Sequence, residues 1–124
     1  MHGNMFVFMK KKILIVDDEE DLRELFSQVI KMAGHEAIVA SGGKEAFELF
    51  QKNKIDAVLT DIRMPKGDGV ELLVNIKDKF PETPVFIMSG YNDYSLEELL
   101  DMGASKVYVK PFNYELFLRE LEEI

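Results

Sequence analysis

The sequence predicts a single doubly wound α/β domain, with a five-stranded parallel sheet of order 2-1-3-4-5 and five helices distributed over both faces. Three observations favour this fold class. Five short apolar runs alternate with longer segments whose apolar residues recur at helical spacing. The runs are almost continuously apolar, which is typical of parallel strands buried on both sides. The 124 residues, 47% of them hydrophobic, suffice for one core.

The first half of the chain contains two predicted strands and two predicted helices. KILIV (12–16) and EAIVA (36–40) are the strands. Between them, apolar residues from Leu22 to Ala33 mark one face of a helix that Gly34 closes. Ser41 and Gly42 open a second helix with an apolar face between positions 46 and 50.

The second half repeats this alternation. A strand at 57–60 runs into Asp61, and after a turn at 64–68 a helix presents apolar residues between positions 70 and 76. Pro81 and Pro84 end that pattern before a strand at 85–88. A short helix at about 95–102 ends at Gly103, a fifth strand follows at 106–109, and positions 114–124 form a last amphipathic helix.

Polar residues of particular types follow four of the strands: Asp17 with Asp18, then Asp61, Ser89 and Lys110. In an open parallel sheet the carboxyl edge holds the ligand crevice, at the point where the strand order reverses. With the order 2-1-3-4-5, the first and third strands lie about 4.8 Å apart. Their three carboxylates would repel one another without a cation. Few protein ligands are on offer, which favours Mg²⁺ over Ca²⁺, and Mn²⁺ could substitute.

The remaining two groups complete a phosphoryl-transfer site. The Ser89 hydroxyl can hydrogen-bond an anionic oxygen beside Asp61. Lys110 lies two strands away, about 10 Å at the backbone, a gap that only a long side chain crosses. A cation, a lysine and a hydroxyl around one carboxylate neutralise phosphoryl oxygens from several sides. Asp61 is therefore the expected nucleophile, giving an acyl phosphate.

Simpler readings exist for each feature taken alone. The acidic pair could be a turn with a helix N-cap, and Asp61 with Lys110 could be a structural salt bridge. Ser89 and Gly90 are also ordinary strand-to-loop residues, and Asp68 is expected as a helix cap. We expect His35 and His2 to be solvated. We also expect three methionines to fill the core: Met32, Met88 and Met102.

The motifs resemble the response-regulator receiver family from about position 11 to the end of the chain. They are ILIVDDE (13–19), TDIRMPKGDGVE (60–71), IMSG (87–90), GAS (103–105) and VKPF (109–112). The resemblance implies a flavodoxin-like fold, Mg²⁺ held by Asp17, Asp18 and the backbone carbonyl of Arg63, and phosphorylation of Asp61. It also makes Lys110 the phosphate-binding lysine and Pro111 a cis-proline.

The resemblance further implies a switch in which Ser89 and the small residue Gly90 respond to the phosphate. The family usually carries an aromatic residue three positions before the lysine, and this chain has Val107 there. Tyr108 is adjacent but should point to the opposite face of its strand. The usual coupling between hydroxyl and aromatic is thereby put in doubt.

The expected partners are a sensor histidine kinase or histidine phosphotransfer protein as donor and a downstream protein target, with the chain a monomer or a phosphorylation-dependent dimer. The formal charge of -8 argues against direct nucleic-acid binding. No apolar stretch is long enough to span a membrane. The absence of cysteine suits a cytoplasmic location.

Two other function classes differ in what they would need. A magnesium phosphohydrolase commonly places a second acid two residues after its nucleophile, where this chain has Arg63. A flavin-binding domain needs a glycine- and hydroxyl-rich loop after the first strand, where this chain has VDDEED. We therefore expect a phosphoacceptor switch that is not an enzyme on other substrates. Positions 1–10 are expected to be an N-terminal extension and 11–124 the receiver domain.

Overall fold

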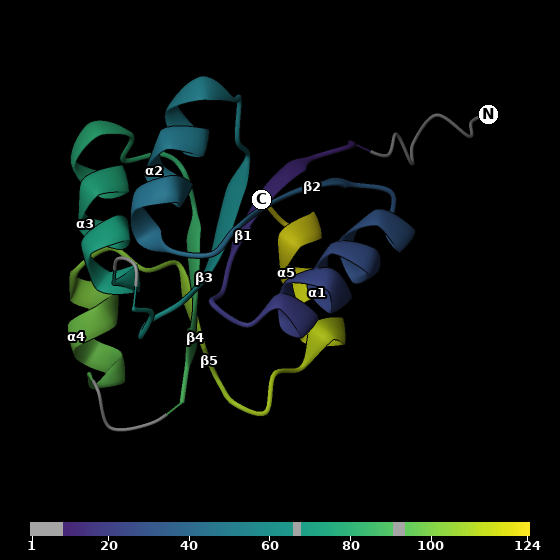
Figure 1. The fold of residues 1–124 in the computed structure, drawn as a ribbon. Helices are drawn as coiled ribbons and strands as arrows, with labels where there is room; N and C mark the ends of the chain where they lie inside the picture. Colours follow the sequence, from purple (N-terminus) through teal and green to yellow (C-terminus); the bar gives the residue numbers. More distant parts are fainter. Residues whose placement is uncertain (1–8, 66–67, 91–93) are drawn as a thin grey trace.

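Five parallel strands form the centre of the structure, a computed structural model that describes residues 9–65, 68–90 and 94–124 (Figure 1). The strand order is β2-β1-β3-β4-β5, so the predicted fold class and order are confirmed. The strands are β1 (Lys12–Val16), β2 (Glu36–Ala40), β3 (Ala57–Asp61), β4 (Val85–Ser89) and β5 (Lys106–Val109).

The helices cover both faces of the sheet, α1 and α5 on one side and α2, α3 and α4 on the other (Figure 1). Within the described residues, no helix combines the length and apolar character needed to cross a membrane. Their bounds are α1 (Glu20–Met32), α2 (Gly43–Lys52), α3 (Gly69–Lys79), α4 (Leu96–Asp101) and α5 (Tyr114–Glu122).

Each strand contributes to two separate hydrophobic cores, which explains why its sequence is apolar without alternation. In β1, Ile13 and Ile15 pack with Phe26 of α1 and Phe117 of α5. The alternate residues of β1 pack with α2, α3 and α4 on the other face. Burying an aliphatic or aromatic side chain fully contributes about 1.5–3 kcal/mol. The two cores therefore fix the sheet on which the polar strand ends are carried.

The strand ends differ from the sequence-based boundaries at two functional positions. β3 includes Asp61 and β4 includes Ser89, because both residues keep ladder positions opposite neighbouring strands. These two polar residues are thus held by the sheet rather than by loops. Helix α2 begins at Gly43, one residue after the predicted opening, and Gly42 is its N-cap.

Local signals at several helix ends agree with the sequence. Asp68 caps α3 by accepting a hydrogen bond from the Val70 N–H at 2.7 Å. Gly103, expected to end the fourth helix, has φ of 110°, a conformation that side-chain-bearing residues rarely adopt. The peptide bond before Pro111 is cis, as the resemblance implied.

Two expectations were wrong. Met32, the last residue of α1, is 87% exposed because it lies outside the apolar face of that helix. Met88, in contrast, is fully buried. His35 is only 3% exposed. Its Nδ1 accepts the Lys11 N–H at 3.0 Å, and its Nε2 lies 3.1 Å from a Glu122 carboxylate oxygen. His2 and most of the expected N-terminal extension lie outside the described residues.

Candidate functional site

The acidic site lies where the chain crosses from one half of the sheet to the other. The β1–β3 register pairs Val16 with Thr60, so the next residues along, Asp17 and Asp61, emerge side by side. Asp18 follows directly. One carboxylate oxygen from each of these three aspartates lies within 4.8 Å of the others. The predicted crowding of three carboxylates at one edge of the sheet is therefore present.

Asp17 has the most demanding environment of the three. Its side chain is fully buried, and Oδ1 accepts the Glu19 N–H at 2.9 Å. Its Oδ2 is buried without a hydrogen-bond partner among the described residues. Burial raises the pKa of Asp17 to about 6; the Glu19 hydrogen bond opposes this rise, and the charge of Asp61 adds to it. A buried carboxylate oxygen without a donor, next to two other acids, fits a cation ligand.

Both oxygens of Asp61 are already oriented by the protein. Oδ1 accepts the Ile62 N–H at 2.8 Å, and Oδ2 accepts Lys110 Nζ at 3.0 Å. The lysine side chain thus reaches across β4, as its length predicts. Burial lowers the pKa of Lys110, but the hydrogen bond and the charge of Asp61 outweigh this effect and leave the pKa raised. Lys110 is therefore a firmly charged ammonium group.

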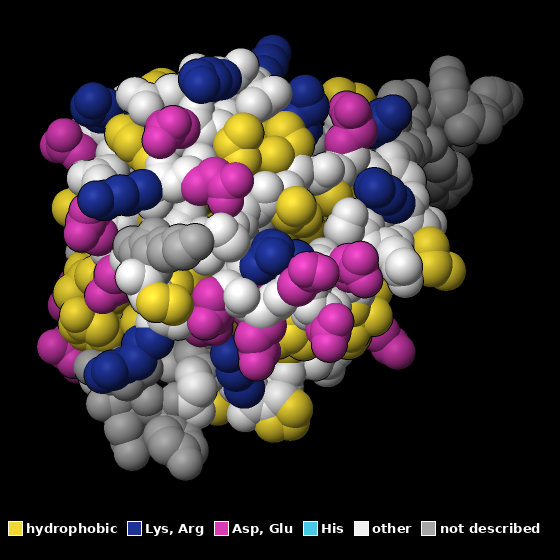
Figure 2. Space-filling view, viewed as in Figure 1, with side chains coloured by type: hydrophobic (Ala, Val, Ile, Leu, Met, Phe, Trp, Pro, Cys, Tyr) yellow, Lys and Arg dark blue, Asp and Glu magenta, His cyan; other side chains and the backbone are white. Residues whose placement is uncertain are grey.

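Strand β4 ends at Ser89, beside the strand that carries Asp61, and Gly90 follows it. Ser89 is 6% exposed at this last position of β4. A Cβ placed on Gly90 would meet no described atom within 4 Å. Figure 2 shows acidic side chains on the lower half of the face in view, with basic side chains among them. Within the cluster, Asp18 is exposed, whereas Asp17 and Asp61 are buried.

Val107 and Tyr108 lie on opposite faces of β5, as expected from strand geometry. Val107 packs against the core of α2, α3 and α4, and Tyr108 is buried in the other core. The Tyr108 hydroxyl donates to Glu120 at 2.6 Å, and Lys106 pairs with the same carboxylate at 3.0 Å. Burial, together with this contact, raises the pKa of Tyr108. Tyr108 therefore holds β5 against α5.

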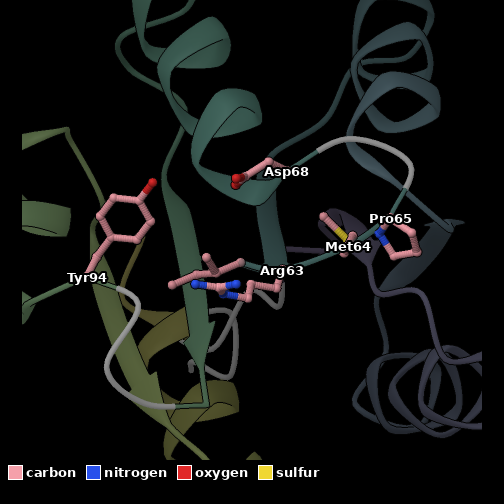
Figure 3. Close-up of a pocket in the computed structure, with 6 residues that line it drawn as sticks. Arg63, Met64, Pro65, Asp68 and Tyr94 are labelled. Carbon is pink, nitrogen blue, oxygen red and sulfur yellow. The ribbon is translucent and has the colours of Figure 1, made fainter.

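A pocket of about 420 Å³ lies between the segment that follows Asp61 and the residues just before α4. Figure 3 shows Tyr94 and Asp68 facing each other across its opening, with the Arg63 side chain extended between the strand and Tyr94. The Arg63 side chain is therefore one of the residues that line this pocket.

Two residues that support the site were not singled out from the sequence. Gly69 approaches β3 so closely that a Cβ there would lie 1.9 Å from the backbone oxygen of Asp61. Arg23, in the first half of α1, donates from Nη1 to the backbone oxygen of Asp17 at 2.7 Å. In the sequence, Arg23 is a basic residue two positions after the five consecutive acidic residues at 17–21.

A helix N-cap, the simpler interpretation of Asp17 and Asp18, does not explain their positions in the loop before α1. The N-cap of α1 is Glu19, which makes no side-chain capping bond, and neither Asp17 nor Asp18 is in the capping position. The ion pair of Asp61 with Lys110 does exist, but it adjoins a cluster of three carboxylates that a structural salt bridge alone does not explain.

Comparison with known proteins agrees with this geometry. Residues 13–122 match the family model for the response regulator receiver domain. Regulatory protein AtoC of Escherichia coli is 37% identical over 105 residues, which are 84% of this chain and 23% of AtoC. Sporulation initiation phosphotransferase F of Bacillus subtilis is 33% identical over 108 residues, 86% of this chain and 87% of that protein.

Solved structures show the same fold. Response regulator protein TrrA of Thermotoga maritima, in complex with Mg²⁺ and BeF, superposes with a TM-score of 0.82 at 31% identity, covering 93% of this chain and 98% of TrrA. A doubly wound sheet with acids, a hydroxyl and a lysine at its carboxyl edge defines a class of phosphate-handling α/β proteins. Within that class, the chain belongs to the response regulator receiver domain family, whose standard function is that of a phosphoacceptor switch.

Receiver domains bind Mg²⁺ at an acidic pocket, and they interact with histidine kinases and with downstream effector domains. They are generally signalling switches, even where a relative is named for an enzymatic activity. This chain spans less than a quarter of AtoC but most of the Bacillus protein. The family therefore occurs both within longer proteins and nearly by itself.

Proposed function

We propose that this chain is a magnesium-dependent phosphoacceptor, in which Asp61 receives a phosphoryl group from a histidine kinase or a histidine phosphotransfer protein. The observation that carries the proposal is the convergence of three carboxylates with the Lys110 ammonium group bonded to Asp61. An external donor is required because His35, the described histidine, contacts Lys11 and Glu122 rather than the acidic cluster.

Four groups would hold the ion: the carboxylates of Asp17, Asp18 and Asp61 and the backbone carbonyl of Arg63. The Oδ2 of Asp17, which has no hydrogen-bond partner in the described part of the chain, supports this assignment. Magnesium suits the site better than calcium because it retains several waters and needs few protein ligands, and manganese could replace it. When bound, the ion would neutralise charge on the aspartates and on the oxygens of the incoming phosphoryl group.

In the proposed reaction, a carboxylate oxygen of Asp61 attacks the donor phosphorus. A P–O bond forms to Asp61 while the P–N bond of the donor phosphohistidine breaks, and the bonding pair leaves with the imidazole, which takes a proton. Lys110 supplies positive charge beside the reacting oxygens, and the Ser89 hydroxyl donates to one of them.

The altered surface would be read by a downstream protein. Phosphorylation of Asp61 would add charge and acceptor oxygens at the end of β3, next to the end of β4 where Ser89 and Gly90 lie. Tyr108 is already hydrogen-bonded to Glu120, and Val107 has no polar group to exchange. We therefore assign the switch to Ser89 and Gly90, with Val107 and Tyr108 as the static part of the β5 surface.

Intact mass after incubation with Mg²⁺ and acetyl phosphate tests the proposal. The native chain should gain one phosphoryl group and Asp61→Asn should gain none. Asp56→Asn is the matched control, because Asp56 lies in the segment before β3, at the opposite end of that strand, and should leave the adduct unchanged. Equal labelling of native and Asp61→Asn chains would exclude Asp61 as the acceptor.

The same preparation separates the switch from a phosphohydrolase. A hydrolase would turn over an added phosphoester such as p-nitrophenyl phosphate in many cycles. The proposed switch would not, because Arg63 occupies the place of the second acid that protonates a leaving group. Sustained release of p-nitrophenol that depends on Asp61 would favour the enzyme.

A further inference from the structure

Several backbone polar groups of the loop between β1 and α1 are held by hydrogen bonds. The Asp17 N–H donates to the Ala40 oxygen at 3.1 Å, which continues the β1–β2 ladder. The Asp17 carbonyl accepts Arg23 Nη1 at 2.7 Å. The Glu19 N–H donates to Asp17 Oδ1 at 2.9 Å. The structure thereby fixes both peptide groups that flank Asp18.

Asp18 itself is in a different situation from its two acidic neighbours. Its side chain is exposed, whereas Asp17 and Asp61 are buried in strand-end positions. The direction in which the Asp18 carboxylate leaves the backbone therefore depends on the two peptide planes on either side of it. One plane is held from within the loop by Asp17 Oδ1, and the other is held from α1 by Arg23.

Arg23 is well suited to this task. Its own N–H bonds to the Glu19 oxygen at 3.1 Å, so the helix anchors its backbone to the same loop. Its side chain is half-buried, and its guanidinium group is a planar, permanently charged donor. A hydrogen bond from such a donor is stronger and shorter than one between neutral groups. The 2.7 Å contact with Asp17 is of this kind.

We propose that Arg23 is a positioning residue for the metal site: it fixes the peptide between Asp17 and Asp18 and so preorganises the Asp18 carboxylate for a divalent cation. This inference rests on the proposed function. It does not make Arg23 a ligand or a catalytic residue, since its bond goes to a backbone oxygen. Without Arg23, metal binding would have to order the loop itself and would become weaker.

The direct test is titration of the native chain and of Arg23→Ala with Mn²⁺, with free Mn²⁺ measured by electron paramagnetic resonance and Mg²⁺ added as competitor. We expect Arg23→Ala to bind about tenfold more weakly, the scale seen when a support of a metal ligand is removed. Arg23→Lys, which keeps a charged donor, should recover part of the loss.

Lys31→Ala is the matched control. It removes the same charge from the same helix, but Lys31 is exposed in the last turn of α1, about 12 Å further along the helix axis. The affinity of Lys31→Ala for Mn²⁺ should equal that of the native chain. A loss equal to that of Arg23→Ala would mean that only net charge matters, and the positioning role would be rejected.

A second readout separates positioning from general damage to the fold. The rate of phosphorylation by acetyl phosphate should require more Mg²⁺ in Arg23→Ala, yet reach the native rate when Mg²⁺ is saturating. A rate that stays low at saturating Mg²⁺ would overturn the proposal. Failure of the native chain to bind Mn²⁺ would reject the proposed function itself, whereas native affinity in Arg23→Ala would reject only the role of Arg23.

Discussion

The buried carboxylate of Asp17 should lower the free energy of unfolding of the metal-free chain. The substitution Asp17→Asn, which removes the charge, tests this. An asparagine keeps the shape of the side chain, and its oxygen can still accept the Glu19 N–H that Asp17 Oδ1 accepts now. Its amide N–H₂ replaces the oxygen that has no donor among the described residues. The substitution therefore removes a buried charge while supplying a donor toward the neighbouring acids.

The size of the effect follows from the pKa of Asp17, which the fold raises from 3.8 to about 6. Below pH 3.8 the carboxyl is protonated in both the folded and the unfolded chain, so it does not lower the free energy of unfolding. Between pH 3.8 and about 6 the unfolded chain ionises this carboxyl while the folded chain keeps its proton, so the free energy of unfolding falls as the pH rises, and the loss is complete above about 6. Two pH units correspond to about 3 kcal/mol, so we expect Asp17→Asn to raise the free energy of unfolding by about 2–3 kcal/mol at pH 7.5.

Urea unfolding in EDTA at pH 7.5 and pH 5 measures both parts of this prediction. The advantage of Asp17→Asn should fall to about half at pH 5, where the folded native chain already holds the proton. In Mg²⁺ the native chain should gain stability by linkage to binding, and Asp17→Asn should gain little. An Asp17→Asn chain that is less stable than the native one in EDTA at pH 7.5 would refute the reasoning.

Three further substitutions test the supports of the site and the core. Gly69→Ala should lower the free energy of unfolding by about 3 kcal/mol and slow phosphorylation, because its Cβ collides with the backbone oxygen of Asp61. Urea unfolding together with acetyl phosphate labelling measures this, and a native-like variant would contradict it. His35→Ala should cost about 2 kcal/mol in the same unfolding assay, because the partly buried Lys11 N–H loses its acceptor. Tyr108→Phe should cost about 1 kcal/mol and let the lowered pKa of Glu120 rise toward its ordinary value, which carboxylate NMR titration would show.

The fold and the gathering of the site residues were predictable because they depend on local patterns. Each strand is a short apolar run, and the polar residue that ends the run lies at the sheet edge whatever the details of packing. The strand order then brings Asp17 and Asp61 together, and the length of Lys110 determines that it reaches them. The roles of these residues in binding and transfer stay predictions.

The features that escaped prediction depend on contacts between distant parts of the chain. His35 is buried because Glu122, 87 positions later, comes to lie beside it. The close approach of Gly69 to the Asp61 backbone depends on how α3 packs beside the end of β3. The hydrogen bond from Arg23 to the Asp17 carbonyl depends on how α1 is oriented relative to the loop before it. Met32 was assigned to the core by residue type alone, although it lies outside the apolar face of its helix.

The most direct test of the account is the metal dependence and the position of the phosphoryl group. The native chain would be incubated with acetyl phosphate in Mg²⁺ or in EDTA, and the modified peptide would be located by mass spectrometry. We expect a single adduct on Asp61 that forms in Mg²⁺ and does not form in EDTA. An adduct that forms equally in EDTA, or that lies on another residue, would contradict this expectation.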